Sequence, residues 1–547
     1  MQKHSRLLAA CVAAMVTITP ALARASGDDK PADKPAEKVA DKAADQSVST
    51  PGTVDVGGQH IAYTAVTGTI TVGATNEQDA QLGPDGKPLP DTNLAAEVAN
   101  AKDASQAPPL ARMFYVAYFK KDANPDQRPI TFLYNGGPGS STVWLHMGSV
   151  GPKHVVTESD THLPAAPYRL ADNAESLLDV TDLVFIDMPG TGFGRLTGKD
   201  AGKAFWGIDQ DGHAFGRFIQ RFLSVNNRWN SPKYIFGESY GTTRSAVLSN
   251  ILENEENIDL NGVILLSQIF NFTTDIDGAH ANPGIDLSYE LALPTYAATA
   301  RYHHKVQPEP PAIEPFLKEV EEFAMGPYAQ ALAKGTDLSS TDKQAMAEKL
   351  HEYTGLPVDY LIKGDLRISG GQFEKSLQED SGMTTGRLDT RFSSPLMDPL
   401  AESAEYDPQS SAISSAYVAL FNEYVRSTLK YGAGQTYLPE ADFGSTEWDM
   451  KHNGNPVFVN VSTDLATAMT TNPRLKVLVN GGYYDLATPF YAAFYEDKHL
   501  PIQDKLASNI EYAWYESGHM VYVKSEALKQ LHDRVAQFIT STDQGNQ

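Results

Sequence analysis

Cysteine is almost absent from this chain of 547 residues. The single cysteine, Cys11, lies among the first 25 residues, which we expect to be removed from the mature protein. A mature chain without a thiol can form no disulfide, has no cysteine nucleophile and binds no metal through cysteine. Its chemistry must therefore depend on other side chains.

Basic residues are also scarce. Lys and Arg number 44 against 68 Asp and Glu, which gives a formal net charge of −24. A surface of this sign repels nucleic acid and anionic membranes. We therefore expect no nucleic-acid partner.

The N-terminal segment lacks an apolar run long enough for a membrane span. Its run at residues 7–18 is shorter than the ~20 residues that a transmembrane helix needs. Lys3 and Arg6 come before this run, and small residues at A-x-A spacing follow it, which is the pattern of a secretory signal peptide. We predict that residues 1–25 are cleaved, that the mature chain has no integral membrane segment, and that the protein is periplasmic or secreted.

The rest of the chain divides by composition into a leader, a core and an insertion. Residues 26–54 are rich in Asp, Lys, Ala and Pro, which predicts a disordered leader. In residues 55–280 and 445–547, apolar strands alternate with amphipathic helices, the order of an α/β protein with helices on both faces of a mostly parallel central sheet. Helical patterns dominate residues 281–444, which we interpret as a helical cap over the edge of the sheet.

Apolar runs give the expected strands of that core. Alternating patterns predict three early strands with an antiparallel start, and continuous apolar runs predict strands that are buried on both faces. The alternating runs are 60–72, 113–119 and 130–134, and the later runs are 183–187, 234–236, 263–266, 475–480 and 510–515.

A G-x-S-x-G sequence occurs at residues 237–241. Alone this motif is weak, but here it follows an apolar strand and opens a helix, the arrangement called a nucleophile elbow. Such a turn exposes the serine, Ser239, at the carboxyl end of the sheet. The alternative is an ordinary turn in which Ser239 only caps the helix.

A nucleophilic serine needs a histidine base and an acid that orients it. In chain order the acid follows a late strand and the histidine follows the last one. Asp485 and His519 have these positions, and they complete a candidate triad with Ser239. No metal-binding motif surrounds the other histidines, so we predict no metal and no cofactor.

An oxyanion in the reaction also needs hydrogen-bond donors. The usual donors are the backbone N–H after the nucleophile and one from the loop after an earlier strand. The N–H groups of Tyr240 and Gly137 fit these two roles.

Four blocks together resemble the serine carboxypeptidase family. In order, they are Asn-Gly-Gly-Pro-Gly-Ser-Ser at 135–141, Asp-Met-Pro-Gly-Thr-Gly-Phe at 187–193, Gly-Glu-Ser-Tyr-Gly at 237–241 and Gly-His-Met-Val at 518–521. The resemblance implies an α/β-hydrolase fold with a helical cap insertion, and removal of the C-terminal residue of a peptide substrate.

The same resemblance implies a site for the terminal carboxylate of the substrate. Asn135, the Gly136 N–H and a protonated Glu238 would bind that carboxylate, and Met520 would line the site beside His519. An ionised Glu238 would instead repel it.

Three positions depart from the family pattern. Ser149 stands where the family has a second glutamate that shares a proton with the one at position 238, and Ser140 stands where it has a half-cystine. The family's Gly-Asp-x-Asp is Gly-Tyr-Tyr-Asp at 482–485. Because Glu238 has no second acid as a partner, we expect a less strict requirement for a carboxylate on the substrate.

Three functions are therefore consistent with the sequence. The first is an exported serine carboxypeptidase that works through an acyl-enzyme. The second is a serine esterase or acyltransferase with the same triad. The third is a non-catalytic binding protein on a hydrolase scaffold.

Overall fold

One ten-stranded sheet organises the chain, with strand order β1-β2-β3-β7-β4-β9-β10-β13-β14 and β8 paired to β3. The structure is a computed structural model that describes residues 46–444, 446–455 and 459–544. The predicted signal peptide and residues 26–45 of the predicted leader lie outside the described residues. The strands are β1 (Ser47–Val56), β2 (Gln59–Gly73), β3 (Leu110–Lys120), β4 (Ile130–Tyr134), β5 (Lys153–Val155), β6 (Leu170–Asp172), β7 (Asp182–Ile186), β8 (Arg195–Thr197), β9 (Lys233–Glu238), β10 (Gly262–Leu266), β11 (Met383–Thr385), β12 (Ser393–Pro395), β13 (Lys476–Gly482) and β14 (Ile510–Tyr515).

The sheet is mixed and mostly parallel, as the sequence predicts. Strands β7, β4, β9, β10, β13 and β14 are parallel neighbours, and β1, β2 and β3 join them through antiparallel pairs. The residues of β4, β7, β9 and β10 are almost all buried. Strands of this kind are apolar throughout because helices cover both faces. The expectation that residues 130–134 belong to an antiparallel start is wrong, because β4 is buried on both faces and runs parallel to β7 and β9.

The prediction of a disordered leader is wrong for its last part. Residues 47–54 belong to β1, which pairs along its whole length with β2. Val54 and Val56 are buried against the sheet. A polar strand of this kind is stabilised by its ladder of hydrogen bonds to a neighbour far more than by its own composition.

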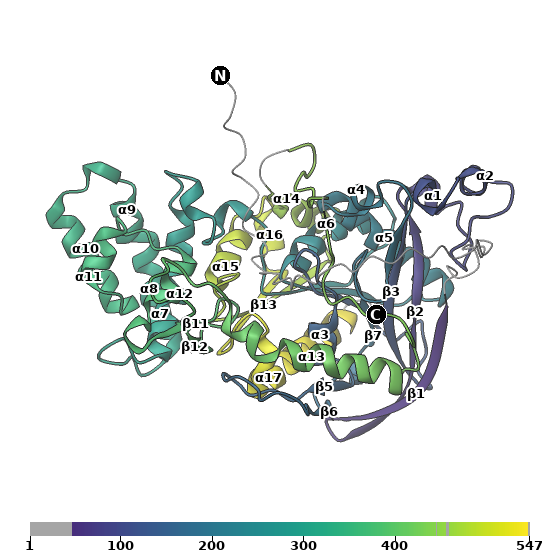
Figure 1. Ribbon diagram of the computed structural model, residues 1–547, viewed down its shortest axis with the longest axis horizontal. Coiled ribbons are helices and arrows are strands. Elements are labelled where there is room, and N and C mark those ends of the chain that lie inside the picture. The colour runs from purple at the N-terminus through teal and green to yellow at the C-terminus, as the bar shows by residue number, and fades with distance from the viewer. Residues whose placement is uncertain (1–45, 445, 456–458, 545–547) are drawn as a thin grey trace, which may run out of the picture. The chain divides into compact units, whose positions relative to one another are not determined.

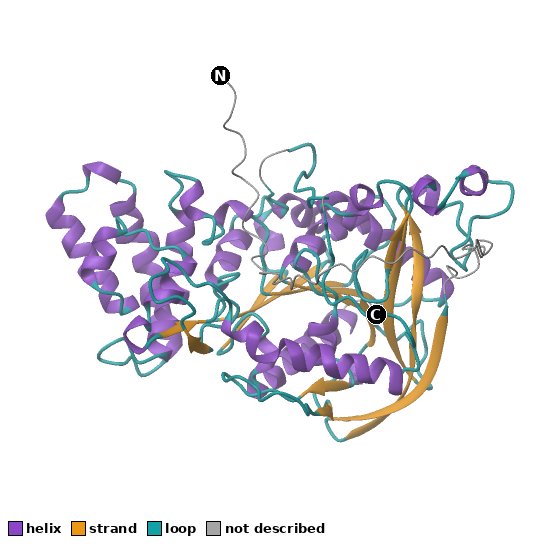
Figure 2. Cartoon of the chain, in the orientation of Figure 1, coloured by secondary structure: helices purple, strands orange, loops and turns teal. Residues whose placement is uncertain are grey.

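Helices cover both faces of the sheet (Figures 1 and 2). Apolar side chains of α3, α13 and α17 fill the core on one face, and those of α5, α6 and α14 fill the core on the other. The helices are α1 (Asn76–Asp79), α2 (Asn93–Asn100), α3 (Val143–Gly148), α4 (Ala201–Phe205), α5 (Ile208–Val225), α6 (Tyr240–Asn254), α7 (Leu287–Tyr302), α8 (Ile313–Phe323), α9 (Ala329–Leu332), α10 (Ser340–Thr354), α11 (Val358–Lys363), α12 (Gly370–Ser376), α13 (Pro408–Ser427), α14 (Ser462–Thr471), α15 (Phe490–Lys498), α16 (Asp504–Ala507) and α17 (Ser525–Gln544).

The helices of the predicted insertion do not all pack together. Helices α7, α8 and α10 to α12 share a third apolar core, which also takes in Tyr483, Tyr484 and Leu486, and they extend from one end of the sheet (Figure 1). Helix α13 instead packs on the sheet with α3. The predicted boundary at residue 444 therefore includes a helix of the core, because α13 carries an apolar stripe that fits α3.

Ser339 is the N-cap of helix α10, and its hydroxyl accepts a hydrogen bond from the Asp342 N–H. None of the described helices is long and apolar enough to cross a membrane.

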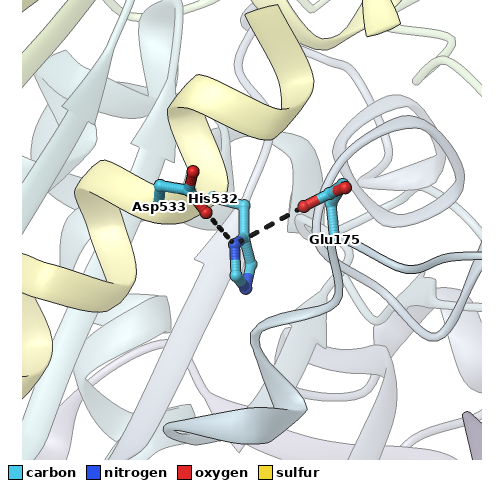
Figure 3. Close-up of side chains that lie close together, drawn as sticks. All are labelled: Glu175, His532 and Asp533. Atoms are coloured by element: carbon cyan, nitrogen blue, oxygen red, sulfur yellow. Dashed lines mark hydrogen bonds and ion pairs between the residues drawn. The ribbon is translucent and has the colours of Figure 1, made fainter. Parts of the chain in front are cut away.

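A buried histidine ties α17 to the segment before β7 (Figure 3). His532 Nδ1 lies 3.1 Å from Asp533 Oδ1 and 3.6 Å from Glu175 Oε2, and Nε2 lies 3.3 Å from Asp179 Oδ2. Burial alone would lower the pKa of His532, but these three carboxylates outweigh it and raise the pKa. The histidine is therefore most stabilising when it carries a proton.

We predict that His532→Gln destabilises the protein in a pH-dependent way. Because the folded-state pKa is raised, the stabilisation is present in full below the unfolded pKa of ~6.5 and is lost as pH rises through the folded value. The free energy of unfolding should fall on the order of 1–3 kcal/mol at pH 6 and much less at pH 9.5. Urea unfolding at both pH values measures this. His60→Gln, at an exposed ion pair with Asp55, is the control and should change little at either pH. A loss that is equal at both pH values would contradict the charged histidine.

Candidate active site

Ser239 lies in a sharp turn between β9 and α6. Its φ is 62° and its ψ is −130°, a backbone conformation that costs on the order of 1–3 kcal/mol outside glycine. The strand and the helix approach very closely here, since a Cβ on Gly237 would lie 2.1 Å from the Gly241 carbonyl oxygen. The predicted elbow is therefore present, and its first glycine is required by this close approach.

The loop after β4 meets this turn. Tyr134 and Gly237 are partners in neighbouring parallel strands, so the segments that follow them emerge at the same edge of the sheet. A Cβ on Gly136 would lie 2.4 Å from the Tyr240 nitrogen. The absence of a side chain at Gly136 thus brings the loop backbone against the first turn of α6.

A buried ion pair between α5 and α6 holds the loop after β4 through a hydrogen bond to its backbone. Arg244, on α6, pairs with Asp211 on α5 at 2.6 Å, and both side chains are fully buried. The same guanidinium donates a 2.6 Å hydrogen bond to the Asn135 carbonyl oxygen and lies over the ring of Phe215. Loss of either charge would leave the other buried and unpaired, which is costly.

A second buried carboxylate holds the far end of the loop. Asp187 accepts hydrogen bonds from the Thr142 N–H at 2.7 Å and from the Tyr437 hydroxyl at 3.1 Å. Burial raises the pKa of Asp187 to about 7, although its hydrogen bonds act in the opposite direction. The block at 187–193 thus supports the loop at 135–141 and does not itself present an ionisable group to the turn at Ser239.

Asp485 and His519 come together as the sequence predicts. The Asp485 Oδ2 and His519 Nδ1 atoms are 2.8 Å apart, and the two residues are 0% and 4% exposed. Since a carboxylate only accepts, Nδ1 carries the proton and leaves Nε2 free to act as a base. Burial alone would lower the pKa of His519, but the charge and hydrogen bond of Asp485 outweigh it and raise the pKa.

The acid itself is held by a turn. Thr488 donates to Asp485 twice, from its N–H at 2.9 Å and from its hydroxyl at 2.7 Å. These bonds aim the carboxylate at the histidine.

Ser239 and His519 are both hydrogen bonded to the short segment at the end of β10. The Ser239 N–H donates to the Leu266 carbonyl oxygen at 3.0 Å, and the Ser267 hydroxyl donates to the His519 carbonyl oxygen at 2.7 Å. Consecutive residues at the end of β10 therefore anchor the serine turn and the histidine loop.

Residues 387–391, which follow β11, connect the acid loop to the histidine loop. The Arg387 carbonyl oxygen accepts from the Leu486 N–H at 3.1 Å, and the Leu388 carbonyl oxygen accepts from the His519 N–H at 2.7 Å. Sequence analysis missed this segment, which lies inside the predicted insertion and carries no motif.

Glu238 lies beside His519 in a buried network. The Tyr522 hydroxyl donates to both Glu238 carboxylate oxygens, at 3.1 and 2.9 Å. Burial raises the pKa of Glu238 to about 7, although His519, Tyr522 and Asn135 lower it. Burial is thus sufficient to raise the pKa of Glu238 without a second acid beside it.

Ser149 does not take the place of a second acid. Its hydroxyl donates to the Leu145 carbonyl oxygen at the end of α3. Tyr522 is the residue that contacts the Glu238 carboxylate, and sequence analysis missed it. Its position three residues after His519, directly after the recognised block at 518–521, is the signal that could have found it.

The remaining predicted residues surround this network. Met520 is 6% exposed and belongs to the core beneath α3, α13 and α17. Ser140, at the position of the expected half-cystine, accepts a 2.8 Å hydrogen bond from the Trp144 indole and donates to Glu440 Oε1 at 3.0 Å. These polar contacts hold Ser140 against the segment that bears Glu440.

Among the described residues, one group of histidine and acidic side chains has its donor atoms close enough to share a metal ion. It consists of Glu175, His532 and Asp533 (Figure 3). Protonated His532 already satisfies these carboxylates as ion pairs, and none of the three belongs to the loops that carry Ser239, Asp485 and His519. We still predict that the protein needs no metal.

The sheet order and the strand–turn–helix at Ser239 define an α/β-hydrolase fold. A family model described as serine carboxypeptidase matches residues 105–521. The chain belongs to the serine carboxypeptidase family.

Individual relatives are distant. Serine carboxypeptidase-like 1 of Arabidopsis thaliana is 26% identical over 192 residues, which cover 33% of this chain and 41% of that protein. A pheromone-processing carboxypeptidase of Phytophthora infestans is 25% identical over 234 residues, or 38% of this chain and 36% of that protein. The chain thus spans about two fifths of the length of these curated relatives.

A solved structure shares the fold over most of the chain. The prohormone-processing carboxypeptidase of Saccharomyces cerevisiae matches 87% of this chain and 91% of its own, with a TM-score of 0.50 and 14% identity. At this identity the likeness concerns the fold.

We predict that Gly136→Ala destabilises the loop after β4. The added Cβ would lie 2.4 Å from the Tyr240 nitrogen and 2.7 Å from the Gly241 nitrogen, so the backbone must move. Overpacking of this kind costs about 1–3 kcal/mol, which urea unfolding measures. The control is Gly326→Ala, because a Cβ at that helical residue meets no atom within 4 Å. Equal stability of the two variants would show that the close approach at Gly136 is unimportant.

Proposed function

We propose that this protein is an exported serine carboxypeptidase that hydrolyses the C-terminal peptide bond of peptides. The observation that carries the proposal is the position of Glu238. This buried carboxyl group, with its raised pKa, precedes Ser239 in the chain and adjoins both Asn135 and His519. A neutral acid beside a nucleophilic serine suits a substrate that ends in a carboxylate.

In the proposed mechanism Ser239 is the nucleophile. His519 Nε2 takes the proton from the Ser239 hydroxyl as its oxygen attacks the last peptide carbonyl carbon, and Asp485 stabilises the imidazolium that forms. The negative oxygen of the tetrahedral intermediate accepts hydrogen bonds from the Gly137 and Tyr240 N–H groups.

The intermediate then collapses. The peptide C–N bond breaks, His519 gives its proton to the leaving amine, and the C-terminal amino acid departs. Water, activated by His519, next attacks the acyl-Ser239 ester and releases the shortened peptide.

The terminal carboxylate of the substrate sets which bond is cleaved. The Asn135 amide oxygen already accepts a 2.8 Å hydrogen bond from the Leu145 N–H, so its NH₂ group is directed to the other side. That group, the Gly136 N–H and protonated Glu238 would bind the carboxylate. An ionised Glu238 would repel it at close range.

Export and the choice of partners follow from the sequence. The predicted signal peptide at 1–25 supports a periplasmic or secreted protein, and the net charge of −24 favours peptides over nucleic acid as partners. The family supports peptide substrates.

We predict that Ser239→Ala lowers kcat at least about 10⁴-fold, because the triad acts as a unit. A fluorophosphonate probe should label the wild type and not this variant. The matched control is Ser224→Ala, an exposed serine at the end of α5 whose hydroxyl bonds to the Gln220 carbonyl oxygen. It should keep labelling and activity. Failure of the wild type to label would instead favour a non-catalytic binding protein.

We predict a bell-shaped pH dependence of kcat/KM for peptides with a free C-terminal carboxylate. Activity should rise as His519 loses its proton, at a pKa above the usual histidine value, and fall as Glu238 ionises near pH 7. The optimum should therefore lie close to neutral pH.

The same peptides with a C-terminal amide give the comparison. They should be cleaved about tenfold more slowly or worse at pH 6.5, since a charge-assisted hydrogen bond contributes about 1.5–3 kcal/mol, and they should lack the alkaline limb. Equal cleavage of acid and amide at every pH would contradict a carboxypeptidase and favour an esterase or acyltransferase.

A further inference from the structure

Tyr522 is a buried partner of Glu238 that no sequence motif assigns. It lies in the helical turn Val521–Val523, directly after His519 and Met520. Its hydroxyl is 3.1 Å from Glu238 Oε1 and 2.9 Å from Oε2, and the two residues are 3% and 2% exposed. The contact is thus a buried one, in which a single hydroxyl faces both oxygens of one carboxylate.

The fold makes room for this contact. A Cβ on Gly148, in α3, would lie 2.5 Å from the Tyr522 ring and 2.6 Å from the Tyr417 hydroxyl. Any larger residue at Gly148 would push these tyrosines away from their places. The tyrosine therefore occupies a space that α3 and α13 leave for it.

Among the described residues, the groups that act on the pKa of Glu238 are His519, Tyr522, Asn135 and Asp485. Tyr417, on α13, in turn responds to the charge of Glu238. Of these groups, the Tyr522 hydroxyl is the neutral donor that lies within hydrogen-bond distance of both carboxylate oxygens.

A phenol differs from a second carboxyl group in one chemical respect. Burial and the neighbouring Glu238 raise the pKa of Tyr522 well above its usual range, so the hydroxyl keeps its proton where Glu238 titrates. A tyrosine can therefore orient Glu238 without adding a negative charge to a site that must accept an anion.

We propose that Tyr522 is a positioning residue for substrate binding, which orients the Glu238 carboxyl group toward the C-terminal carboxylate of a peptide in place of a second acid. This proposal rests on the proposed carboxypeptidase function. While Glu238 is ionised, the Tyr522 hydroxyl donates to it. Once Glu238 is protonated, its own O–H donates to the substrate carboxylate, and the Tyr522 hydroxyl holds the other Glu238 oxygen in place.

The test is the pH profile of Tyr522→Phe, which removes one oxygen and keeps the ring. Loss of a donor to the ionised form makes ionisation of Glu238 harder. The alkaline limb of kcat/KM for free-acid peptides should shift to higher pH by on the order of half to one unit. Below that limb KM should rise several-fold with kcat little changed, because the carboxyl group is less well oriented. A merely structural tyrosine would lower activity equally at all pH values, and that result would overturn the proposal.

Tyr417→Phe is the matched control. Tyr417 is equally buried and responds to the charge of Glu238, but its hydroxyl is not among the groups found to hydrogen bond to the Glu238 carboxylate in the described chain. It should leave the alkaline limb in place. A shift of equal size in both variants would mean that general packing, and not the Tyr522 hydroxyl, sets the limb.

An infrared titration separates this proposal from the proposed function. The carboxyl stretch that disappears in Glu238→Gln reports protonation of Glu238 without any substrate. Its midpoint should be higher in Tyr522→Phe than in the wild type, and an unchanged midpoint would overturn the proposal. If the wild type cleaves peptide acids and amides equally while the midpoint still shifts, the carboxypeptidase function fails and the pairing of Tyr522 with Glu238 stands.

Discussion

The close approach of β9 and α6 is the constraint on which the rest of the site depends. Gly237 permits this approach, because a Cβ there would lie 2.1 Å from the Gly241 carbonyl oxygen, and the chain can then turn only through the strained conformation of Ser239. The turn directs the first N–H groups of α6 toward the loop after β4, and Gly136 lets that loop lie against them. The ion pair between Arg244 and Asp211 then ties the loop to the helices below. The strain at one residue is offset by packing that involves two strands, two helices and a loop.

Burial sets the electrostatics of the site more than paired charges do. Glu238 and Asp187 are buried among neutral donors, and burial raises the pKa of each to about 7. His519 differs because it faces the buried Asp485, whose hydrogen bond outweighs desolvation. Asp187 and Glu238 thus have similar pKa values, but they differ in their surroundings. Asp187 supports the loop from within, while Glu238 adjoins the proposed nucleophile and can exchange a proton where a substrate anion would bind.

The sequence predicted the features that depend on local patterns. Continuous apolar runs identified the buried strands, glycine spacing identified the turn at Ser239, and chain order identified Asp485 and His519, which the structure joins at 2.8 Å. Features that depend on distant partners were missed. β1 has a polar, leader-like composition and becomes a strand only because β2 pairs with it. Tyr522 looks like an ordinary core tyrosine until the fold brings Glu238 to its hydroxyl. The boundary of the insertion was misplaced because the apolar stripe of α13 does not reveal which surface it will cover.

The insertion is part of the site as well as a neighbour of it. Its segment at 387–391 bonds through backbone carbonyl oxygens to Leu486 and His519, and Tyr483 and Tyr484 pack into the apolar core of its helices. The loop that bears the proposed acid therefore packs into the core of the insertion, although it directly follows β13 of the sheet. Because backbone hydrogen bonds depend little on side-chain identity, this connection can persist while the side chains of the insertion vary. The geometry between Asp485 and His519 thus depends on the backbone of residues 387–391 more than on the side chains of the insertion.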